Sequence, residues 1–275
     1  MMNKIYIHDE NLKYPANDFT HMIESEKVHD YTYDKDFEYR LRGFKHKFVK
    51  FIFKTIVLLI VQPVCYVRYA LRIKGKKNYR KYKRISGSKG MISICNHTTE
   101  WDTVMVMTSR YFKFPEFPVW QEGIESKSGM FFRYAGGLAM PYNSFKGTYF
   151  AYNAMKDVVN EGKWLHVYPE AACWAFYPAL REFKDGIFKL AYETKKPILP
   201  MVVKYRPNKG LYKLFKKHPN ATLIIGEPIE TNYSLEKKES IEDLSKRSHL
   251  AMVNLLGIES EEENAILNKQ LKKEN

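Results

Sequence analysis

A histidine and an aspartate, His97 and Asp102, lie five residues apart at a point where the chain must change direction. Five residues separate two side chains by about 140° on a helix and place them on opposite faces of a strand, so no single regular element brings them together. Met91–Cys95 is a short apolar run of strand type, and either threonine after His97 can cap a helix that begins near Trp101. The sequence therefore predicts a strand, a bend and a helix, with the imidazole and the carboxylate meeting across the bend.

This pair has the composition of a proton-accepting site. A histidine at a strand end, oriented by a carboxylate one turn into the next helix, can take a proton from a hydroxyl group. We therefore predict that His97 is a catalytic general base and that Asp102 fixes its imidazole. The other histidines have no carboxylate at a suggestive spacing, and for them we predict surface or structural roles: His8, His21, His29, His46, His166, His218 and His249.

Short apolar runs alternate with helical patterns from residue 91 onward. The strand-like runs are residues 91–95, 117–120, 138–140, 164–168, 198–203 and 222–225. Apolar residues at three- and four-residue spacing predict helices over 150–159, after Gly186, and over 241–255. This alternation is typical of an α/β fold. It predicts a largely parallel central sheet flanked by helices, in a domain that spans residues 85–257.

The two ends of the chain differ in composition from this domain. Residues 1–40 carry nine acidic and five basic residues, which predicts a polar arm that is partly disordered or loosely docked. Residues 258–275 are acidic and then basic, which predicts a charged, frayed tail. The first residues lack the apolar core and the small-residue cleavage site of a signal peptide, so we expect none.

The cysteines are odd in number and widely spaced, at Cys65, Cys95 and Cys173. This pattern favours a reducing compartment and argues against a disulfide framework or a zinc site, so we predict no metal. Cys95 and Cys173 raise the alternative of a covalent intermediate on a cysteine, although neither has an evident base nearby in the sequence.

Residues 41–84 combine the most apolar stretch of the chain with its strongest positive charge. Residues 41–90 hold fifteen Lys and Arg and no acid, and residues 51–67 are apolar apart from Lys54, Gln62 and Pro63. Because a spanning helix needs roughly 20 nearly uninterrupted apolar residues, a helical pair that dips into one leaflet fits better. We predict docking to an anionic membrane at its cytoplasmic face, as a peripheral or monotopic protein.

Two alternatives to membrane docking of this basic block remain open. A nucleic-acid partner predicts a binding signature, and the sequence contains no zinc-finger, helix-turn-helix or aromatic RNA-binding motif, so we expect no nucleic acid. A buried core helix with a solvated basic rim is the simpler alternative. Clustering fifteen like charges is costly without an anionic partner, which favours membrane contact.

A second carboxylate follows another predicted strand. Residues 164–168 lead into Pro169 and Glu170, and in open α/β sheets ligands gather at the carboxyl ends of the strands. Glu170 is therefore a candidate binder of a substrate hydroxyl, with a solvated loop glutamate or a helix cap as the alternative. Proline at 197 and 200 predicts that the strand over 198–203 is an edge strand or pairs irregularly.

Several of these segments, in this order, resemble the blocks of the glycerophospholipid acyltransferase family, whose best-known members acylate 1-acylglycerol-3-phosphate. The resemblance covers about residues 85–230. The first block resembles the family's histidine-four-residues-aspartate motif, and the third its aromatic-Pro-Glu string. The matching segments are Asn96–Asp102, Phe132–Asn143, Tyr168–Glu170, Phe183–Ala191 and Lys196–Met201.

This resemblance implies transfer of a fatty acyl group from an acyl thioester, acyl-CoA or acyl-ACP, to a lysophospholipid hydroxyl. The acyl thioester would be a substrate rather than a cofactor, an acyl carrier protein would be a partner in the case of acyl-ACP, and no other cofactor would be needed. The turn at 97–99 or the glycine pair at 136–137 would supply backbone N–H groups for the oxyanion. The preceding basic and apolar helices also resemble the family's membrane-docking element.

The sequence departs from the family at its phosphate-binding arginines. Where the third block usually continues Gly-Thr-Arg, this chain has Ala171-Ala172-Cys173, and Tyr142 or Asn143 replaces the arginine of the second block. A cysteine or a tyrosine cannot replace a bidentate guanidinium. Either other cations supply the charge, or the acceptor is not a simple phosphomonoester. The candidate cations are Lys146, Arg133, Arg181 and Lys184. We assign Lys146, Arg181 and Lys184 to substrate binding, together with Glu170.

Other functions remain compatible with these residues. The same chemistry on a non-phosphomonoester lipid or on a sugar hydroxyl would explain the missing arginines. A membrane-associated scaffold without activity would explain them as well, although the intact His97 and Asp102 argue against it. A hydrolase would use water in place of the acceptor.

Overall fold

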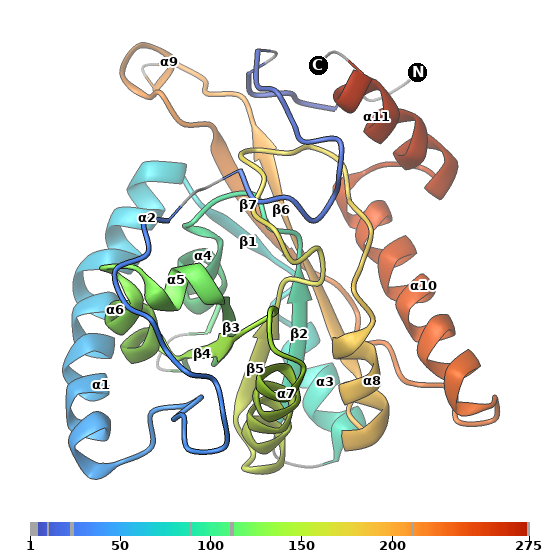
Figure 1. Ribbon diagram of the computed structural model, residues 1–275. Coiled ribbons are helices and arrows are strands. Elements are labelled where there is room, and N and C mark those ends of the chain that lie inside the picture. Colours follow the sequence, from blue (N-terminus) through green and yellow to red (C-terminus); the bar gives the residue numbers. More distant parts are fainter. Residues whose placement is uncertain are drawn as a thin grey trace.

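The computed structural model describes residues 5–9, 11–22, 25–87, 90–110, 113–210 and 212–273. A five-stranded sheet lies at its centre, in the order β1-β7-β6-β2-β5 (Figure 1). All neighbouring strands are parallel except β6 and β7, so the predicted α/β fold with a largely parallel sheet is confirmed. The strands are β1 (Arg72–Lys74), β2 (Met91–Cys95), β5 (Trp164–Val167), β6 (Ile198–Arg206) and β7 (Asn220–Ile225).

A smaller parallel pair extends this sheet beyond β5. It consists of β3 (Phe117–Trp120) and β4 (Gly137–Met140). Glu116 bridges the pair to β5, because its N–H donates to the Trp164 carbonyl at 2.8 Å and its carbonyl accepts from the His166 N–H at 2.8 Å. Both strands were predicted, and their carboxyl ends lie on the same side as that of β5.

Helices cover both faces of the sheet and give it two cores. Along β2, Ile92 and Ile94 point into one core, whereas Met91 and Cys95 point into the other, as the two-residue period of a strand requires. The first core contains α7 (Phe145–Asn160), α8 (Gly186–Thr194) and α10 (Lys237–Leu256). The second contains parts of α2 (Gln62–Tyr69), α3 (Asn78–Ser86) and α4 (Asp102–Thr108).

The helix α7 shows how local sequence sets an element. The Ser144 side chain caps it by accepting the Gly147 N–H at 3.0 Å. Its buried face carries Ala151, Ala154 and Val158, at the predicted spacing. The predicted helices over 150–159, after Gly186 and over 241–255 are confirmed as α7, α8 and α10.

Of the two alternatives predicted for the strand after Pro197, an edge strand or irregular pairing, the edge strand is wrong. β6 lies inside the sheet, between β2 and β7, and Pro200 pairs with Ile94. The Pro200 carbonyl points toward β7, where it accepts the Gly226 N–H. Because the N–H and carbonyl groups of a strand residue point to the same neighbour, the N–H that Pro200 lacks would also have pointed toward β7. Regular pairing with β7 begins only at Met201, so the proline sits where the ladder with β7 has not yet started.

The apolar segment is one continuous helix rather than the expected helical pair. It runs over α1 (Phe44–Ile56), a π-helical turn η1 (Val57–Val61) and α2. The π turn, in which the Gln62 N–H reaches the Val57 carbonyl, makes room for Pro63 in the first turn of α2. By length and composition alone, Phe44–Tyr69 is long and apolar enough to cross a membrane.

The described parts of residues 5–40 and 258–273 pack on this fold, which differs from the expectation of a partly disordered or loosely docked arm and a frayed tail. In the arm, Tyr14 is buried near Trp174, and Arg40 pairs with Glu116. The last described segment is the helix α11 (Glu261–Lys273), in which Asn264 exchanges two hydrogen bonds with the backbone of Leu180. The remaining short helices are α5 (Gln121–Glu125), α6 (Gly129–Ala135) and α9 (Tyr212–Phe215).

Candidate active site

The His97 and Asp102 side chains meet across the bend, as predicted. His97 lies two residues past the end of β2, Asp102 begins α4, and the Nδ1 to Oδ2 distance is 3.2 Å. Asp102 is fully buried, and its carboxylate also accepts the Thr98 N–H at 2.5 Å and the Thr99 N–H at 2.9 Å. One carboxylate therefore shapes the turn and orients the imidazole.

The His97 ring is fixed by contacts on its face and its edge. Tyr168, just past β5, stacks on it with ring centroids 4.0 Å apart and an angle of 14° between the planes. The Tyr168 hydroxyl is held in turn by Thr103 Oγ1 at 2.9 Å. With Nδ1 turned to Asp102, the second ring nitrogen, Nε2, can accept a proton.

Cys173 is a partner of His97 that sequence spacing did not reveal. Its side chain forms a hydrogen bond with His97, and the Trp174 N–H donates to the His97 carbonyl at 3.1 Å. Burial by itself would lower the pKa of His97, but the contacts with Cys173 and Asp102 outweigh burial and raise it to about 10. Cys173 is only 4% exposed.

Glu170 and Arg181 form a buried ion pair rather than a substrate-binding surface. The side chains are 1% and 0% exposed, and Arg181 Nη2 lies 3.2 Å from Glu170 Oε2. Glu170 also accepts the His97 N–H at 2.8 Å and the Arg181 N–H at 2.9 Å. The pair therefore holds the backbone of His97, which differs from the role in substrate binding expected from the sequence.

The other predicted cations lie in three different places. Lys184 lines the cavity beside His97 and packs its Nζ 3.4 Å from the centre of the Phe19 ring. Lys146 is exposed on the first turn of α7 and does not line that cavity. Arg133 is buried against the N-terminal arm, where it donates to the Glu38 carbonyl.

The backbone amides expected to form an oxyanion hole have other partners. The N–H groups of residues 97–99 donate to Glu170 and Asp102. Gly136 donates to the Arg133 carbonyl, and neither Gly136 nor Gly137 lines the cavity. The expectation for residues 97–99 is therefore wrong, because these amides hold the carboxylates that build the turn.

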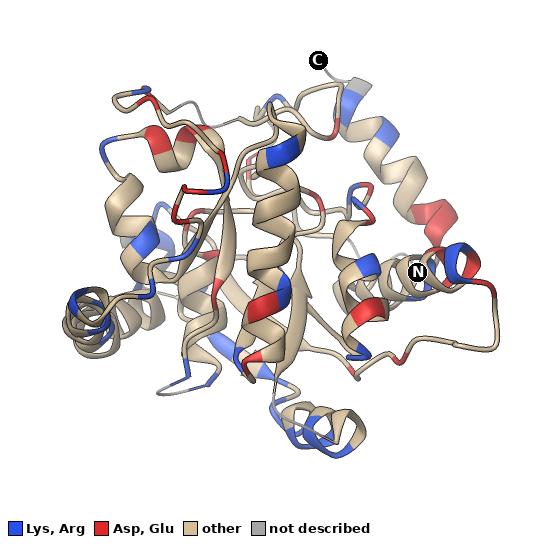
Figure 2. Ribbon diagram, turned by 60° about the horizontal axis from the view of Figure 1, so that its bottom comes forward, with Lys and Arg blue, Asp and Glu red and all other residues tan. Residues whose placement is uncertain are grey.

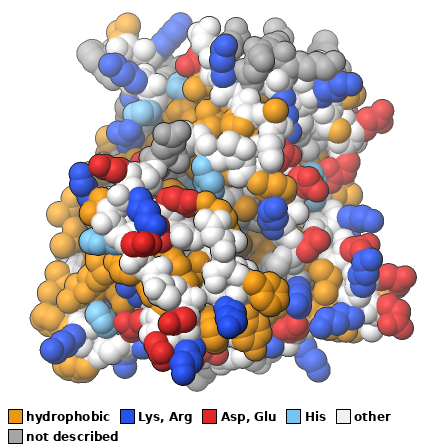
Figure 3. Space-filling model, viewed as in Figure 1, with side chains coloured by type: hydrophobic (Ala, Val, Ile, Leu, Met, Phe, Trp, Pro, Cys, Tyr) orange, Lys and Arg blue, Asp and Glu red, His pale blue; other side chains and the backbone are white. Residues whose placement is uncertain are grey.

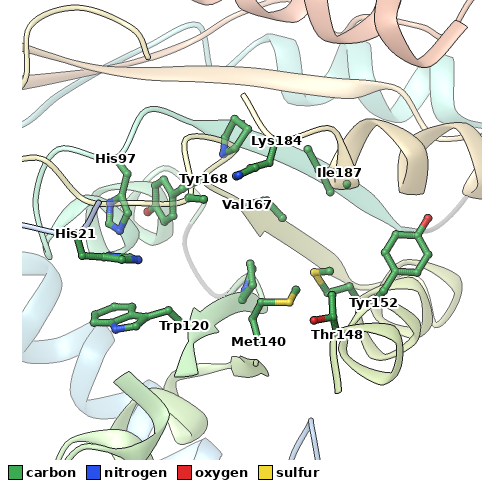
Figure 4. Close-up of a pocket in the computed structure, with 15 residues that line it drawn as sticks. His21, His97, Trp120, Met140, Thr148, Tyr152, Val167, Tyr168, Lys184 and Ile187 are labelled. Carbon is green, nitrogen blue, oxygen red and sulfur yellow. The ribbon is translucent and has the colours of Figure 1, made fainter. Parts of the chain in front are cut away.

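A cavity of about 390 Å³ opens beside His97, at the carboxyl ends of β5 and β3 (Figure 4). Its size is that of a small-molecule site. Figure 4 shows His97 and His21 at one end of the cavity and the hydroxyl-bearing Thr148 and Tyr152 of α7 at the other, and the wall between the two ends is mainly apolar. The residues of this wall include Pro118, Met140, Met155, Val167 and Ile187.

One lining residue, His21, comes from the N-terminal arm. Its ring stacks on Trp120 at 5.2 Å between centroids, and Figure 4 shows it beside His97 at the same end of the cavity. The expectation of a surface or core role for His21 is thus corrected. Because 76 positions separate it from His97, no local pattern could have revealed it.

Among the residues that the structure describes, no group of three or more His, Cys, Asp or Glu side chains is placed to hold a metal.

Comparisons with known proteins identify the family to which this part of the chain is similar. Residues 70–204 match the family model described as Acyltransferase. A solved structure of the 1-acyl-sn-glycerophosphate (LPA) acyltransferase PlsC from Thermotoga maritima is similar, with a TM-score of 0.47 and 18% identity over 76% of this chain and 83% of that chain. No curated protein matches the chain. The family resemblance is confirmed, because residues 70–204, which include His97, Asp102 and Glu170, match the acyltransferase family.

Proposed function

We propose that the protein transfers a fatty acyl group from an acyl thioester to the hydroxyl of a lysophospholipid such as 1-acylglycerol-3-phosphate. The observation that carries the proposal is the His97 and Asp102 contact at one end of a largely apolar cavity, within an acyltransferase domain. The apolar walls suit an alkyl chain, and the imidazole suits the hydroxyl that attacks.

The reaction follows from the orientation of the imidazole. In its deprotonated form, the His97 imidazole takes the proton of the acceptor hydroxyl at Nε2, while the hydroxyl oxygen attacks the thioester carbonyl carbon. Asp102, at 3.2 Å from Nδ1, stabilises the imidazolium that forms. The tetrahedral oxyanion then collapses, the carbon–sulfur bond breaks, and the leaving thiolate recovers the proton from His97. General-base assistance of this kind accelerates a reaction by roughly 10²–10⁴-fold.

The acceptor head group must find its positive charge without the family's arginines. Lys184 supports a phosphate-bearing acceptor, because it is the lysine that lines the cavity beside His97. Arg181 is engaged with Glu170, and Lys146 lies on the outside of α7. An acceptor with a different head group, or a sugar hydroxyl, is the second candidate, and the single lysine among the described lining residues is the observation that favours it.

We further propose that the helix Phe44–Tyr69 docks the enzyme on an anionic membrane at its cytoplasmic face. Its outward face is apolar at three- and four-residue spacing, from Phe44 through Phe48, Ile52, Ile56, Leu59 and Ile60 to Val64 and Val67. The two polar residues that interrupt the sequence point inward: Gln62 is buried, and Lys54 lies over the Phe114 ring. Such a helix suits the plane of a membrane interface.

The view of the surface agrees with this placement. Apolar side chains gather along the left edge of the molecule, over α1 (Figure 3). Basic residues are spread over many elements rather than gathered in one groove (Figure 2), an arrangement that suits a broad anionic surface better than a nucleic-acid duplex.

A panel of acceptors tests the proposed reaction. Purified protein is incubated with oleoyl-CoA or oleoyl-ACP and with 1-acylglycerol-3-phosphate, other lysophospholipids or water alone, and the products are identified by mass spectrometry. We expect a diacylated phospholipid that is absent with His97→Ala. Free fatty acid as the only product would indicate a hydrolase, and no product with either donor would favour the inactive scaffold.

A further inference from the structure

The N-terminal arm reaches the active site through residues 17–22, which lie outside the part of the chain that matches the acyltransferase family. Several residues of the domain fix this segment. The Trp174 Nε1–H donates to the Thr20 carbonyl at 2.8 Å, and the Arg181 guanidinium donates to the Asp18 carbonyl. Lys184 lies against the Phe19 ring. The segment is therefore held in place beside the cavity by the same loop that carries the ion pair of Glu170.

This anchoring places the His21 ring in the wall of the cavity. Trp120, at the end of β3, supports one face of the ring at an angle of 25°. Figure 4 shows His21, Trp120 and His97 together at one end of the cavity, with the apolar wall extending away from them. A side chain backed by an aromatic ring in this way is fixed in orientation before a substrate arrives.

The proposed reaction determines which part of a substrate lies against His21. The acceptor hydroxyl has to reach His97, while the acyl chain of the donor needs the apolar wall formed by residues such as Met140 and Val167. Figure 4 shows His21 beside His97 at the end of the cavity where the acceptor hydroxyl has to bind. Lys184 lies farther along the cavity, beyond Tyr168, with its amino group turned toward this end.

We propose that His21 contacts the acceptor, donating a hydrogen bond from its imidazole to an oxygen of the acceptor's anionic head group, so that the N-terminal arm completes the acceptor site. This inference rests on the proposed acyl transfer. It also explains how a chain without the family's arginines binds a phosphate-bearing acceptor, since the arm adds a hydrogen-bond donor that the domain lacks.

The electrostatics around His21 fit this role. Burial lowers the pKa of His21, positively charged His97 and Arg181 lower it further, and Glu122 opposes them. The imidazole is thus neutral at neutral pH. A neutral imidazole still offers one N–H to a phosphate oxygen.

Three variants of one residue separate hydrogen bonding from packing. His21→Phe keeps an aromatic ring on Trp120 but removes the N–H groups, His21→Gln keeps an N–H donor, and His21→Ala removes both. His29→Ala is the matched control, because His29 belongs to the same arm and is exposed. The measured quantities are kcat and KM for 1-oleoylglycerol-3-phosphate and for oleoyl-CoA, with circular dichroism to confirm folding.

We expect His21→Phe and His21→Ala to raise KM for the acceptor by about tenfold, the loss of one hydrogen bond to a charged group, and to leave KM for oleoyl-CoA unchanged. His21→Gln should lie closer to the wild type, and His29→Ala should match it. Wild-type acceptor kinetics in a folded His21→Phe variant, or a change confined to the KM of oleoyl-CoA, would overturn the inference.

The same experiment distinguishes this inference from the proposed function. If the wild type and His97→Ala release coenzyme A at the same rate, the acyl-transfer proposal fails, and the inference fails with it. If turnover depends on His97 but not on His21, only the role of His21 is refuted.

Discussion

Replacing Arg181 by methionine tests whether this residue supports the site or binds the substrate. The guanidinium is fully buried and bonds to Glu170, to the Ala172 carbonyl and to the Asp18 carbonyl. Arg181→Met therefore leaves the Glu170 carboxylate buried without its cation. Removal of one partner of a buried ion pair typically destabilises a protein by about 3–5 kcal/mol.

We expect the free energy of unfolding of Arg181→Met to fall by about this amount. For a chain of this size, it corresponds to a decrease in Tm of roughly 6–20 °C. Urea and thermal unfolding followed by circular dichroism measure both quantities. The control is Lys146→Ala, an exposed substitution on α7 that should change stability by no more than about 0.5 kcal/mol.

The double variant Glu170→Gln/Arg181→Met sharpens the test. Because it removes the charge of both partners, it should be less destabilised than the sum of the two single variants, and the difference measures the coupling. The reasoning would be refuted if Arg181→Met unfolded like the wild type and only its KM for the acceptor rose. That result would return Arg181 to the role in substrate binding that the sequence first indicated.

Three further outcomes follow from the structure. Cys173→Ala should remain active, and its mass spectrum should show no acyl-cysteine. Because Cys173 helps to raise the pKa of His97, the rise of activity with pH should move to lower pH in this variant. An unchanged pH dependence of activity would contradict this. Cys95→Ser should have wild-type kcat, since Cys95 is fully buried and does not line the cavity, and a trapped acyl-enzyme on Cys95 would show the reverse. Leu59→Glu should reduce sedimentation with anionic liposomes by about tenfold by placing a charge on the apolar face, whereas His29→Ala should sediment normally.

Local sequence patterns predict most helices and strands of this fold and the contact between His97 and Asp102 in its site. The strand before His97 and the helix after it are marked by apolar residues within a few positions, so the bend and the contact with Asp102 follow from spacing alone. The strands β2 to β7 were expected for the same reason, because each contains a run of apolar residues, whereas β1 is short and bears two charges. Here the local sequence and the tertiary structure favour the same conformation.

Contacts between distant residues were beyond such patterns. The loop between Glu170 and Arg181 folds back so that two charges expected to face a substrate neutralise each other. His21 reaches the cavity only because Trp174 and Trp120 hold the arm there. A histidine in a polar segment carries no sign of such a placement, since the partners that create it lie about 100 and 150 residues away.

Two differences between the prediction and the structure depend on the direction in which a backbone group or a side chain points. Pro200 predicted an edge strand or irregular pairing, and the strand is interior because the missing N–H faces the side where pairing with β7 has not begun. Lys54 and Gln62 were counted as interruptions of an apolar stretch, yet both point toward the protein and leave the outer face apolar. In each case the direction of the group, rather than the residue type alone, determined its effect on the structure.

The most direct measurement is the rate at which folded His97→Ala acylates 1-oleoylglycerol-3-phosphate from oleoyl-CoA, compared with the wild type under the same conditions. Loss of the general base should reduce kcat by about 10²–10⁴-fold while the circular dichroism spectrum stays unchanged. Near wild-type turnover by the folded variant would contradict the assignment of His97 and, with it, the proposed mechanism.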